Sequence, residues 1–418
     1  MISKWGVTNF KSIREANLDL APLTIFTGTN SSGKSSFLDS IAIAAQFHNE
    51  GEEEGPKKHE IKFKPNNDLV QLGEVRDIFH YNASKHESID FDFIMDYNYH
   101  FKFSLMPYKP NTLIMETDTM RKKNIEGFVI EQYEDPEMDH EIELERDDIE
   151  GRLYNYFSPS VFQYLGPFRN PPLLPNKKEF DGKDVLYVNS DGSNTFAVLN
   201  KLYNEDVPYC FPDIIEKREY DKKKSYTLIH TLDRWLKYFE LCDTCKVDDN
   251  GVLKFYIDGK IYTLPQLGSG VSQILPILVM CLTAQNQITI NTAKKISVYP
   301  TIIIKEPESH FHPKVQSRLA DLFIAMALSG RQCLIETHSE YLIYMLRYHI
   351  SQSLLRNDKS IQNVIKILYT EKNEGKTNFH EIKVNRYGEI SAWPDGFFDE
   401  RQKMSDMMLE GIISEIDI

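Results

Sequence analysis

The most informative segment about the fold is Gly28-Thr29-Asn30-Ser31-Ser32-Gly33-Lys34-Ser35. It fits the pattern G-x-x-x-x-G-K-[ST] and has the flanking residues that this pattern needs. The residues before it, Leu23–Thr27, are apolar and β-branched and contain no Gly or Pro, which predicts a buried strand. After it, apolar residues recur at helical spacing, at Phe37, Leu38, Ile41, Ala42 and Ala45. A strand, a loop and a helix in this order predict a phosphate-binding loop.

The residue types of this loop predict its chemistry. Its glycines let consecutive backbone N–H groups turn inward, and the start of the following helix adds positive potential. We expect Lys34 to reach the β- and γ-phosphates of a nucleotide and Ser35 to ligate Mg²⁺. The nucleotide-binding residues expected here are Gly28, Asn30, Ser31, Ser32, Gly33, Lys34, Ser35 and Ser36.

Composition narrows the class of protein. The 418 residues suffice for one large domain with insertions or for two to three smaller domains. A net charge of −14 argues against a protein that coats nucleic acid through its overall charge, although a local basic groove stays open. Five cysteines, including a lone C-x-x-C at Cys242 and Cys245, predict reduced thiols in a cytoplasmic protein. No segment reaches the roughly 18 apolar residues of a membrane span.

Three further motifs follow in the second half of the chain. Thr301–Lys305 predicts a buried strand that delivers Glu306 beside the phosphates, where this acid could orient or deprotonate an attacking water. Gln332–Glu336 predicts another strand, which hands His338 to a loop. Ser269-Gly270 opens an apolar helical run with small and hydroxyl side chains, which indicates a second anion site.

Periodicity predicts the other elements. Two or three strands are expected over residues 2–27, and an antiparallel meander is expected from four short β-like runs, at 89–94, 101–106, 112–116 and 127–132. The remaining expectations are a solvated, mobile loop over 46–67, an acidic exposed face over 131–150, an amphipathic helix over 227–240, a hairpin over 252–264 and a β-rich tail from residue 364.

The order of these motifs resembles that of a known group of proteins. The segments that carry the resemblance are 9–13 (NFKSI), 164–169 (YLGPFR), 270–276 (GVSQILP), 306–313 (EPESHFHP), 336–340 (ETHSE) and 393–398 (WPDGFF). Together they look like the ABC-type ATPase head of the SMC and OLD-like proteins. They look more closely like the bacterial subgroup that includes Septu-type and retron-associated defence ATPases.

The resemblance implies an α/β fold, namely an ABC-type P-loop ATPase head with a mixed β-sheet, an antiparallel β lobe and a helical insertion, followed by a small β-rich C-terminal cap. Residues 1–170 would form the N-terminal part of the head with the phosphate loop and the β lobe, and 171–265 would form an insertion of helices and a β-hairpin. Residues 266–360 would complete the head, and 361–418 would form the cap.

The resemblance also implies that the head binds ATP and Mg and forms a homodimer or a higher oligomer. Each nucleotide would lie between the phosphate loop of one subunit and Ser269 and Gly270 of the other. Glu306 and His338 would be catalytic, His338 as the switch histidine at the γ-phosphate, and Gln71 is a weaker candidate for the lobe-linking glutamine. The implied setting is antiphage defence with a separately encoded HNH-type nuclease, through which nucleic acid could be contacted.

Two departures from this group stand out. The group's acid before Glu306, which helps to hold Mg²⁺ through water, is Lys305 here. At roughly 5 Å and an effective dielectric constant near 20, a lysine would repel a dication by about 6 kcal/mol, which predicts slow hydrolysis unless the ammonium points away or pairs with phosphate. The second departure is that the residues after His338 contain no nuclease motif. Separately, no role for Arg169 can be derived from the sequence.

Two alternative functions remain open. One is a DNA-repair ATPase that clamps DNA through a basic surface, whose sources would be Lys57-Lys58, Arg121-Lys122-Lys123 and Lys222-Lys223-Lys224. Each of these runs is more often a solvated charge run. The other is a scaffold that hydrolyses poorly and assembles with nucleotide bound, which Lys305 favours.

Overall fold

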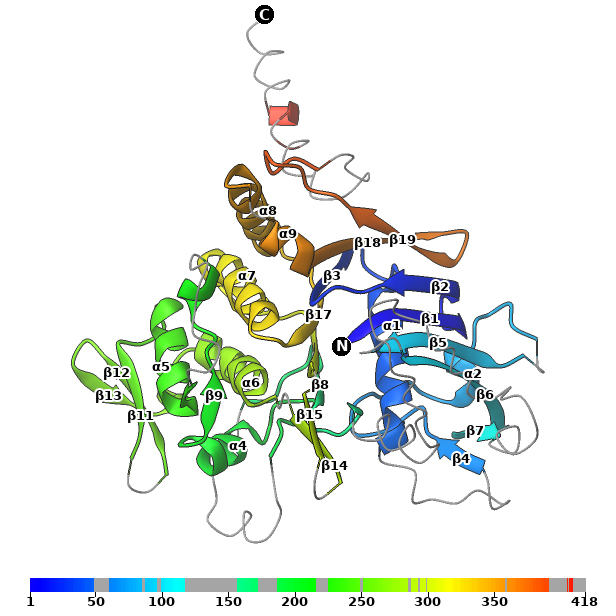
Figure 1. The fold of residues 1–418 in the computed structure, drawn as a ribbon, viewed down its shortest axis with the longest axis horizontal. Coiled ribbons are helices and arrows are strands. Elements are labelled where there is room, and N and C mark those ends of the chain that lie inside the picture. The colour runs from blue at the N-terminus through cyan, green and yellow to red at the C-terminus, as the bar shows by residue number, and fades with distance from the viewer. Residues whose placement is uncertain are drawn as a thin grey trace, which may run out of the picture.

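The computed structural model (Figure 1) describes residues 1–48, 60–84, 87–95, 99–116, 156–171, 186–215, 225–248, 251–284, 287–291, 294–297, 299–357, 359–390, 404 and 406–408. Within these residues a central sheet, seen nearly edge-on in Figure 1, lies between an antiparallel sheet on one side and a group of helices on the other. The expected α/β class with an antiparallel lobe is confirmed.

The central sheet contains the strand that leads into the phosphate loop. Its strand order is β19-β18-β3-β17-β16-β8, and all neighbours are parallel except β18 and β19, which form a hairpin. The bounds are β3 Leu23–Gly28, β8 Phe162–Leu165, β16 Thr301–Lys305, β17 Gln332–Glu336, β18 Ile365–Asn373 and β19 Lys376–Ile382. Since β17 lies between β3 and β16, the carboxyl ends of these three strands meet at one edge of the sheet.

The described residues also form helices, most of which pack beside the central sheet (Figure 1). They are α1 Lys34–Ala44, α2 Val75–Ile78, α4 Thr195–Leu202, α5 Leu228–Tyr238, α6 Ser269–Thr283, α7 Pro313–Leu328, α8 Glu340–Leu355 and α9 Ser360–Val364, with 3₁₀ turns at Ala45–His48, Pro212–Ile215 and Leu264–Gln266. The amphipathic helix expected over 227–240 is α5, in which Leu232, Trp235 and Leu236 are fully buried. Pro313 stands in the first turn of α7, where a missing N–H costs nothing.

The antiparallel sheet has the order β2-β1-β5-β6-β7-β4. Its bounds are β1 Ile2–Phe10, β2 Ile13–Asp19, β4 Glu60–Phe63, β5 Ile89–Met95, β6 Tyr99–Lys109 and β7 Thr112–Glu116. Three of the four expected meander strands are thus confirmed, while the run at 127–132 and the acidic stretch lie outside the described residues. Aromatic side chains of the antiparallel sheet stack in its core, where the ring centroids of Trp5 and Phe93 lie 4.6 Å apart.

The other described strands form small antiparallel sheets. They are β9 Asp206–Pro208 with β10 Ser225–Thr227, β11 Thr244–Val247 with β12 Leu253–Ile257 and β13 Lys260–Tyr262, and β14 Gln287–Asn291 with β15 Lys294–Ser297. The predicted turn at Asp258 and Gly259 joins β12 to β13, and both residues have the positive φ (49° and 73°) that a tight hairpin turn requires.

Side chains of the central strands alternate between two cores. Ile304 packs in the core that contains α5 to α8, whereas Ile303 packs with α1 and the antiparallel sheet. Leu334 on β17 belongs to the same core as Ile303. Because successive strand residues point to opposite faces, Lys305 and Glu336 share the face of Ile303 and Leu334, which α1 covers. The strand period therefore directs these two side chains toward the phosphate-loop helix.

Two expectations about the chain need correction. The C-terminal strands are not a separate cap, because β18 pairs in parallel with β3 and extends the central sheet. The loop expected over 46–67 is too long, since Gln46 is buried and bonded to Lys64, and β4 pairs with β7. In both cases the deciding contacts are pairings across long sequence separations, which local composition does not report. Among the described residues, no helix has the length and apolarity to cross a membrane.

Candidate nucleotide-binding site

The phosphate loop joins the carboxyl end of β3 to the first turn of α1. Gly28 has a φ of 141°, and a Cβ on it would lie 2.1 Å from the carbonyl oxygen of Thr370 on β18. Gly33 has a φ of 110°, and a Cβ there would lie 2.1 Å from Thr377 Oγ1 on β19. Both glycines are required by backbone conformation and by the close approach of the β18/β19 hairpin.

Lys34 folds back onto its own loop. Its Nζ donates to the carbonyl oxygens of Gly28, at 3.1 Å, and Thr29, at 2.7 Å, and lies 3.5 Å from Ser32 Oγ. Burial lowers the pKa of Lys34, and nearby carboxylates, that of Glu336 foremost, oppose this effect. The ammonium thus lies inside the loop, where anionic oxygens can replace its carbonyl partners.

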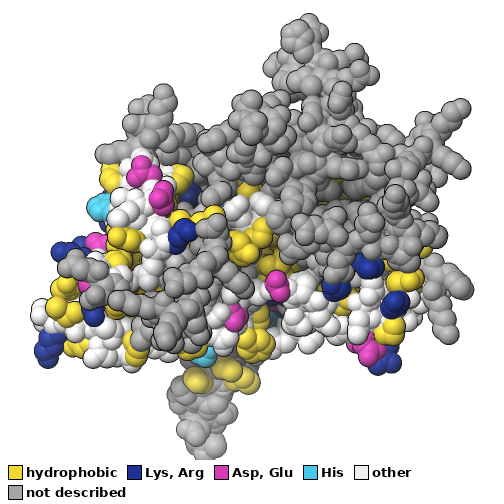
Figure 2. All heavy atoms as spheres, turned by 90° about the horizontal axis from the view of Figure 1, so that it is seen from below, with side chains coloured by type: hydrophobic (Ala, Val, Ile, Leu, Met, Phe, Trp, Pro, Cys, Tyr) yellow, Lys and Arg dark blue, Asp and Glu magenta, His cyan; other side chains and the backbone are white. Residues whose placement is uncertain are grey.

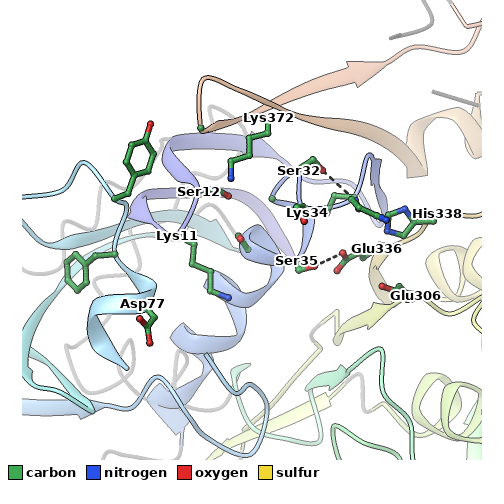
Figure 3. A pocket seen from close by; sticks show the side chains of 17 residues that line it. Lys11, Ser12, Ser32, Lys34, Ser35, Asp77, Glu306, Glu336, His338 and Lys372 are labelled. Atoms are coloured by element: carbon green, nitrogen blue, oxygen red, sulfur yellow. Dashed lines mark hydrogen bonds between the residues drawn. The ribbon is translucent and has the colours of Figure 1, made fainter. Parts of the chain in front are cut away.

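A cavity of about 750 Å³ opens in front of the loop, and Figure 3 shows the side chains that line it. The loop contributes residues 30–36 to its wall, and the ends of β16 and β17 contribute Glu306, Glu336 and His338. Lys11 and Lys372 also line it. A concave site of this size, with several convergent polar groups, is typical of a small-molecule site.

Glu336 is the carboxylate that contacts the loop directly. Ser35 Oγ donates to Glu336 Oε1 at 2.6 Å, the dashed contact in Figure 3. The other carboxylate oxygen, Oε2, is buried and has no hydrogen-bond partner among the described residues. Burial raises the pKa of Glu336, while Lys305, the Ser35 hydroxyl and Lys34 lower it. Glu336 was expected at a strand end from the sequence, without a role in the site.

Lys305 does not line the cavity. Its ammonium is bonded to the carboxylate of Asp39 on α1 and lies 5.4 Å from the centre of the Tyr164 ring. Lys11 Nζ reaches the same carboxylate at 3.1 Å, and the Tyr164 hydroxyl donates to it at 3.2 Å. The expectation that Lys305 repels a dication therefore needs correction, because its ammonium points to α1 and its charge is paired with that of Asp39.

Glu306 lies in a backbone conformation that is rare for a side-chain-bearing residue, with a φ of 46°. Its N–H donates to the carbonyl oxygen of Glu336 at 2.8 Å, and its own carbonyl accepts from Arg169 Nη2 at 2.9 Å. Ser309 Oγ lies 3.4 Å from its carboxylate. The structure thus brings Glu306 to the cavity wall, with its backbone fixed from two sides.

His338 also reaches the cavity wall, close to Lys34 in Figure 3. Its backbone N–H donates to Glu308 Oε1 at 2.6 Å. Burial lowers the pKa of His338, and the charge of Lys34 lowers it further. A neutral imidazole at this point can donate a hydrogen bond to an anionic oxygen without adding charge.

Not every predicted residue comes to the cavity. Ser269 and Gly270, at the start of α6, do not line it, and neither does Gln71, whose side chain is exposed and donates to the carbonyl of Asn67. Arg169, which the sequence left without a role, is buried between α6 and β16 and joins Gln273 to the Lys305 carbonyl. No signal in the sequence indicated this last contact.

Among solved structures, the SMC head domain from Thermotoga maritima is 11% identical, with a TM-score of 0.40, over 92% of this chain and 99% of that chain. A Pyrococcus furiosus Smc head domain with an extended coiled coil, bound to the C-terminal domain of ScpA, is 10% identical, with a TM-score of 0.42, over 98% and 99% of the two chains. A search of curated proteins gave no match.

Two family models match the sequence. Residues 362–406 match a family described as a protein of unknown function, DUF3696. Residues 23–343, which include the phosphate loop, Glu306, Glu336 and His338, match a second family. Because this match covers well over half of the chain, the protein belongs to the family described as "AAA domain, putative AbiEii toxin, Type IV TA system".

Proposed function

We propose that this chain is an ATPase that binds ATP with Mg²⁺ in the cavity between the phosphate loop and the ends of β16 and β17. The observation that carries the proposal is Lys34, whose partly buried ammonium is bonded, among the described residues, to the loop itself and faces a cavity of about 750 Å³. Phosphate oxygens bound there would be contacted by the ammonium, by the loop N–H groups and by the positive start of α1. The residues present fit the nucleotide.

The chain also holds the groups that hydrolysis needs. Glu306 is the candidate to orient an attacking water and take its proton, since its carboxylate stands on the cavity wall beyond the loop. His338 is the candidate to donate a hydrogen bond to the oxygens that become more negative in the transition state. Bound Mg²⁺ would supply charge neutralisation for the phosphates, and Ser35 is a residue that would hold it.

Assembly is part of the proposal. Ser269 and Gly270 lie at the exposed start of α6, away from the cavity of their own chain. A small, hydroxyl-bearing helix start can bind an anion. In a homodimer or a higher oligomer these residues would close the cavity of a second copy, so that ATP lies between two heads.

The biological setting we propose is bacterial antiphage defence, with a separately encoded nuclease, of HNH type, as the partner. Its support is the resemblance of the motifs and a family description that names a toxin of a toxin–antitoxin system. Direct DNA clamping is less favoured, because the Lys and Arg side chains visible in Figure 2 are scattered among hydrophobic and acidic ones on that face. All three basic runs that such clamping would use lie outside the described residues.

ATP turnover with Mg²⁺ tests the proposal, with oligomer mass measured in parallel. We expect turnover in the wild type, loss of nucleotide binding in Lys34→Ala, and binding without turnover in Glu306→Gln. Lys237→Ala, on the exposed side of α5, is the matched lysine control and should behave as the wild type. Assembly with ATP but no wild-type turnover would favour the scaffold, and salt-dependent DNA binding by the chain alone would favour the clamp.

A further inference from the structure

A lysine and a glutamate occupy paired positions at the edge where the proposed nucleotide lies. Lys305 at the end of β16 and Glu336 at the end of β17 are partners in the parallel register, and both point to the face covered by α1. The motif pattern leads one to expect an acid at position 305. Here the acid stands one strand closer to the phosphate loop, because β17 is the neighbour of β3.

The two charged ends point to different partners. The Lys305 ammonium is bonded to Asp39, one turn beyond Ser35 on α1, and is 7% exposed, so that it makes no part of the cavity wall. The Glu336 carboxylate lines the cavity and accepts from Ser35 Oγ at 2.6 Å. The side chain that the sequence suggested would repel a cation is thus removed from the cavity, and a carboxylate takes the position beside the hydroxyl that would ligate the cation.

Glu336 also has an unused oxygen. Its Oε2 is buried and without a hydrogen-bond partner among the described residues, and the whole residue is only 3% exposed. Leaving a charged oxygen buried and unpaired is costly, whereas a divalent cation or one of its waters would satisfy it. Mg²⁺ binds oxygen ligands in octahedral geometry and is held in phosphate sites by one or two protein oxygens together with waters and phosphates.

We infer that Glu336, together with Ser35, holds the divalent cation of this chain. Glu336 thereby takes the role of the acid that the motif pattern leads one to expect at position 305, where this chain has Lys305. The inference rests on the nucleotide binding proposed above and deepens it by assigning the metal site. Lys305 then has a different function, which is to keep Asp39 paired beneath that site.

A purely structural role for Glu336 is the competing explanation. In that case its charge would only balance Lys305 and Lys34, and its removal would weaken nucleotide binding equally with and without a cation. A metal-holding role predicts a selective effect on the cation-dependent part of binding. The two explanations are therefore separated by measuring affinity in both conditions.

The experiment is equilibrium binding of a fluorescent ATP analogue, in EDTA and in Mg²⁺, to the wild type and Glu336→Gln. We expect the Mg²⁺-dependent gain in affinity to fall about 10- to 100-fold in Glu336→Gln, while affinity in EDTA stays within about twofold. Glu308→Gln is the matched control, because Glu308 is also a buried carboxylate with one unpartnered oxygen but does not line the cavity. It should keep the gain of the wild type.

Thermal unfolding of each variant with ATP and Mg²⁺, against ATP and EDTA, gives a second readout that needs no turnover. If Glu336→Gln fails to fold, Glu336→Asp keeps the charge on a shorter side chain and should retain part of the gain. A full Mg²⁺-dependent gain in a folded Glu336 variant overturns the inference and leaves the proposed function standing. A wild type that binds no analogue in either buffer overturns the proposed function and the inference with it.

Discussion

Arg169 and Gln273 are bonded to each other in both directions: Arg169 Nε donates to Gln273 Oε1 at 3.0 Å, and Gln273 Nε2 donates to the Arg169 carbonyl at 3.3 Å. The same guanidinium donates to the carbonyls of Lys305, at 3.1 Å, and Glu306, at 2.9 Å. One buried side chain thus connects α6, which begins at Ser269, with the backbone of the proposed catalytic glutamate.

This connection predicts that Arg169 positions Glu306. Arg169→Lys keeps the charge but loses the planar fork, so that the strained backbone of Glu306 is no longer held from the α6 side. We expect ATP affinity to stay within about twofold and turnover to fall at least about tenfold, because small misplacements of a catalytic group are costly. Gln273→Leu should share the defect. A lower melting temperature with normal turnover in folded Arg169→Lys would show a structural role only.

The β18/β19 hairpin holds the phosphate loop in place. Thr377 Oγ1 donates to the Ser32 carbonyl at 2.8 Å and lies 2.7 Å from Ser12 Oγ, while its N–H donates to the Ser12 carbonyl at 2.9 Å. Thr377→Val removes the hydroxyl at nearly constant volume and leaves buried acceptors unpaired, which should cost about 1–3 kcal/mol of unfolding free energy and weaken ATP binding. Urea denaturation and analogue titration measure both effects. Thr377→Ser keeps the hydroxyl and is the control; equal losses in both variants would exclude the hydrogen bonds as the cause.

Substituting an acid at position 305 should not repair this site. In Lys305→Asp the new carboxylate would face Asp39 and Glu336 without the ammonium that pairs Asp39 at present. Breaking a buried ion pair typically costs about 3–5 kcal/mol, and we expect Lys305→Met near the lower end because Lys11 still reaches Asp39. Lys305→Asp should lose more. Urea denaturation at pH 7 gives the comparison, and a Lys305→Asp protein that is as stable as the wild type and turns over faster would contradict the pairing argument.

Sequence reasoning found the parts of the site that are local. The phosphate loop, Glu306 and His338 each follow a strand in a recognisable motif, and all three reach the cavity. It missed Glu336, because the contact with Ser35 joins residues 301 positions apart and depends on β17 lying next to β3. The sequence nevertheless contained a signal. Lys305 stands where an acid is expected, and an acid, Glu336, stands at the end of the neighbouring strand as its register partner.

The C-terminal hairpin was missed as part of the sheet for the same physical reason. Strand β18 pairs in parallel with β3, and a parallel pairing between the two ends of the chain leaves no local mark in composition or periodicity. The run itself was correctly predicted as β. What the sequence could not supply was its neighbour, and with it the role of Thr377 against the loop.

The thiols give a prediction about reactivity. All five cysteines are free and buried, and burial raises the pKa of Cys210 to about 11 and those of Cys242 and Cys333 to about 12. Since the thiolate is the reactive form, iodoacetamide at pH 8 should label the folded protein slowly and label all five cysteines after unfolding in guanidinium. Mass spectrometry counts the labels. Rapid native labelling at Cys242 or Cys245 would instead indicate a reactive C-x-x-C.

These shifts also fix the sign of a pH effect. A thiol whose folded pKa is raised contributes stability that is complete below its unfolded pKa of about 8.5 and is lost as pH rises toward the folded value. Between pH 8 and 10.5 the unfolded chain releases thiol protons that the folded chain keeps, so the urea midpoint should fall. Cys242→Ala removes one such group and should flatten the decline. A midpoint that rises over this range would contradict burial as the cause of the raised pKa values.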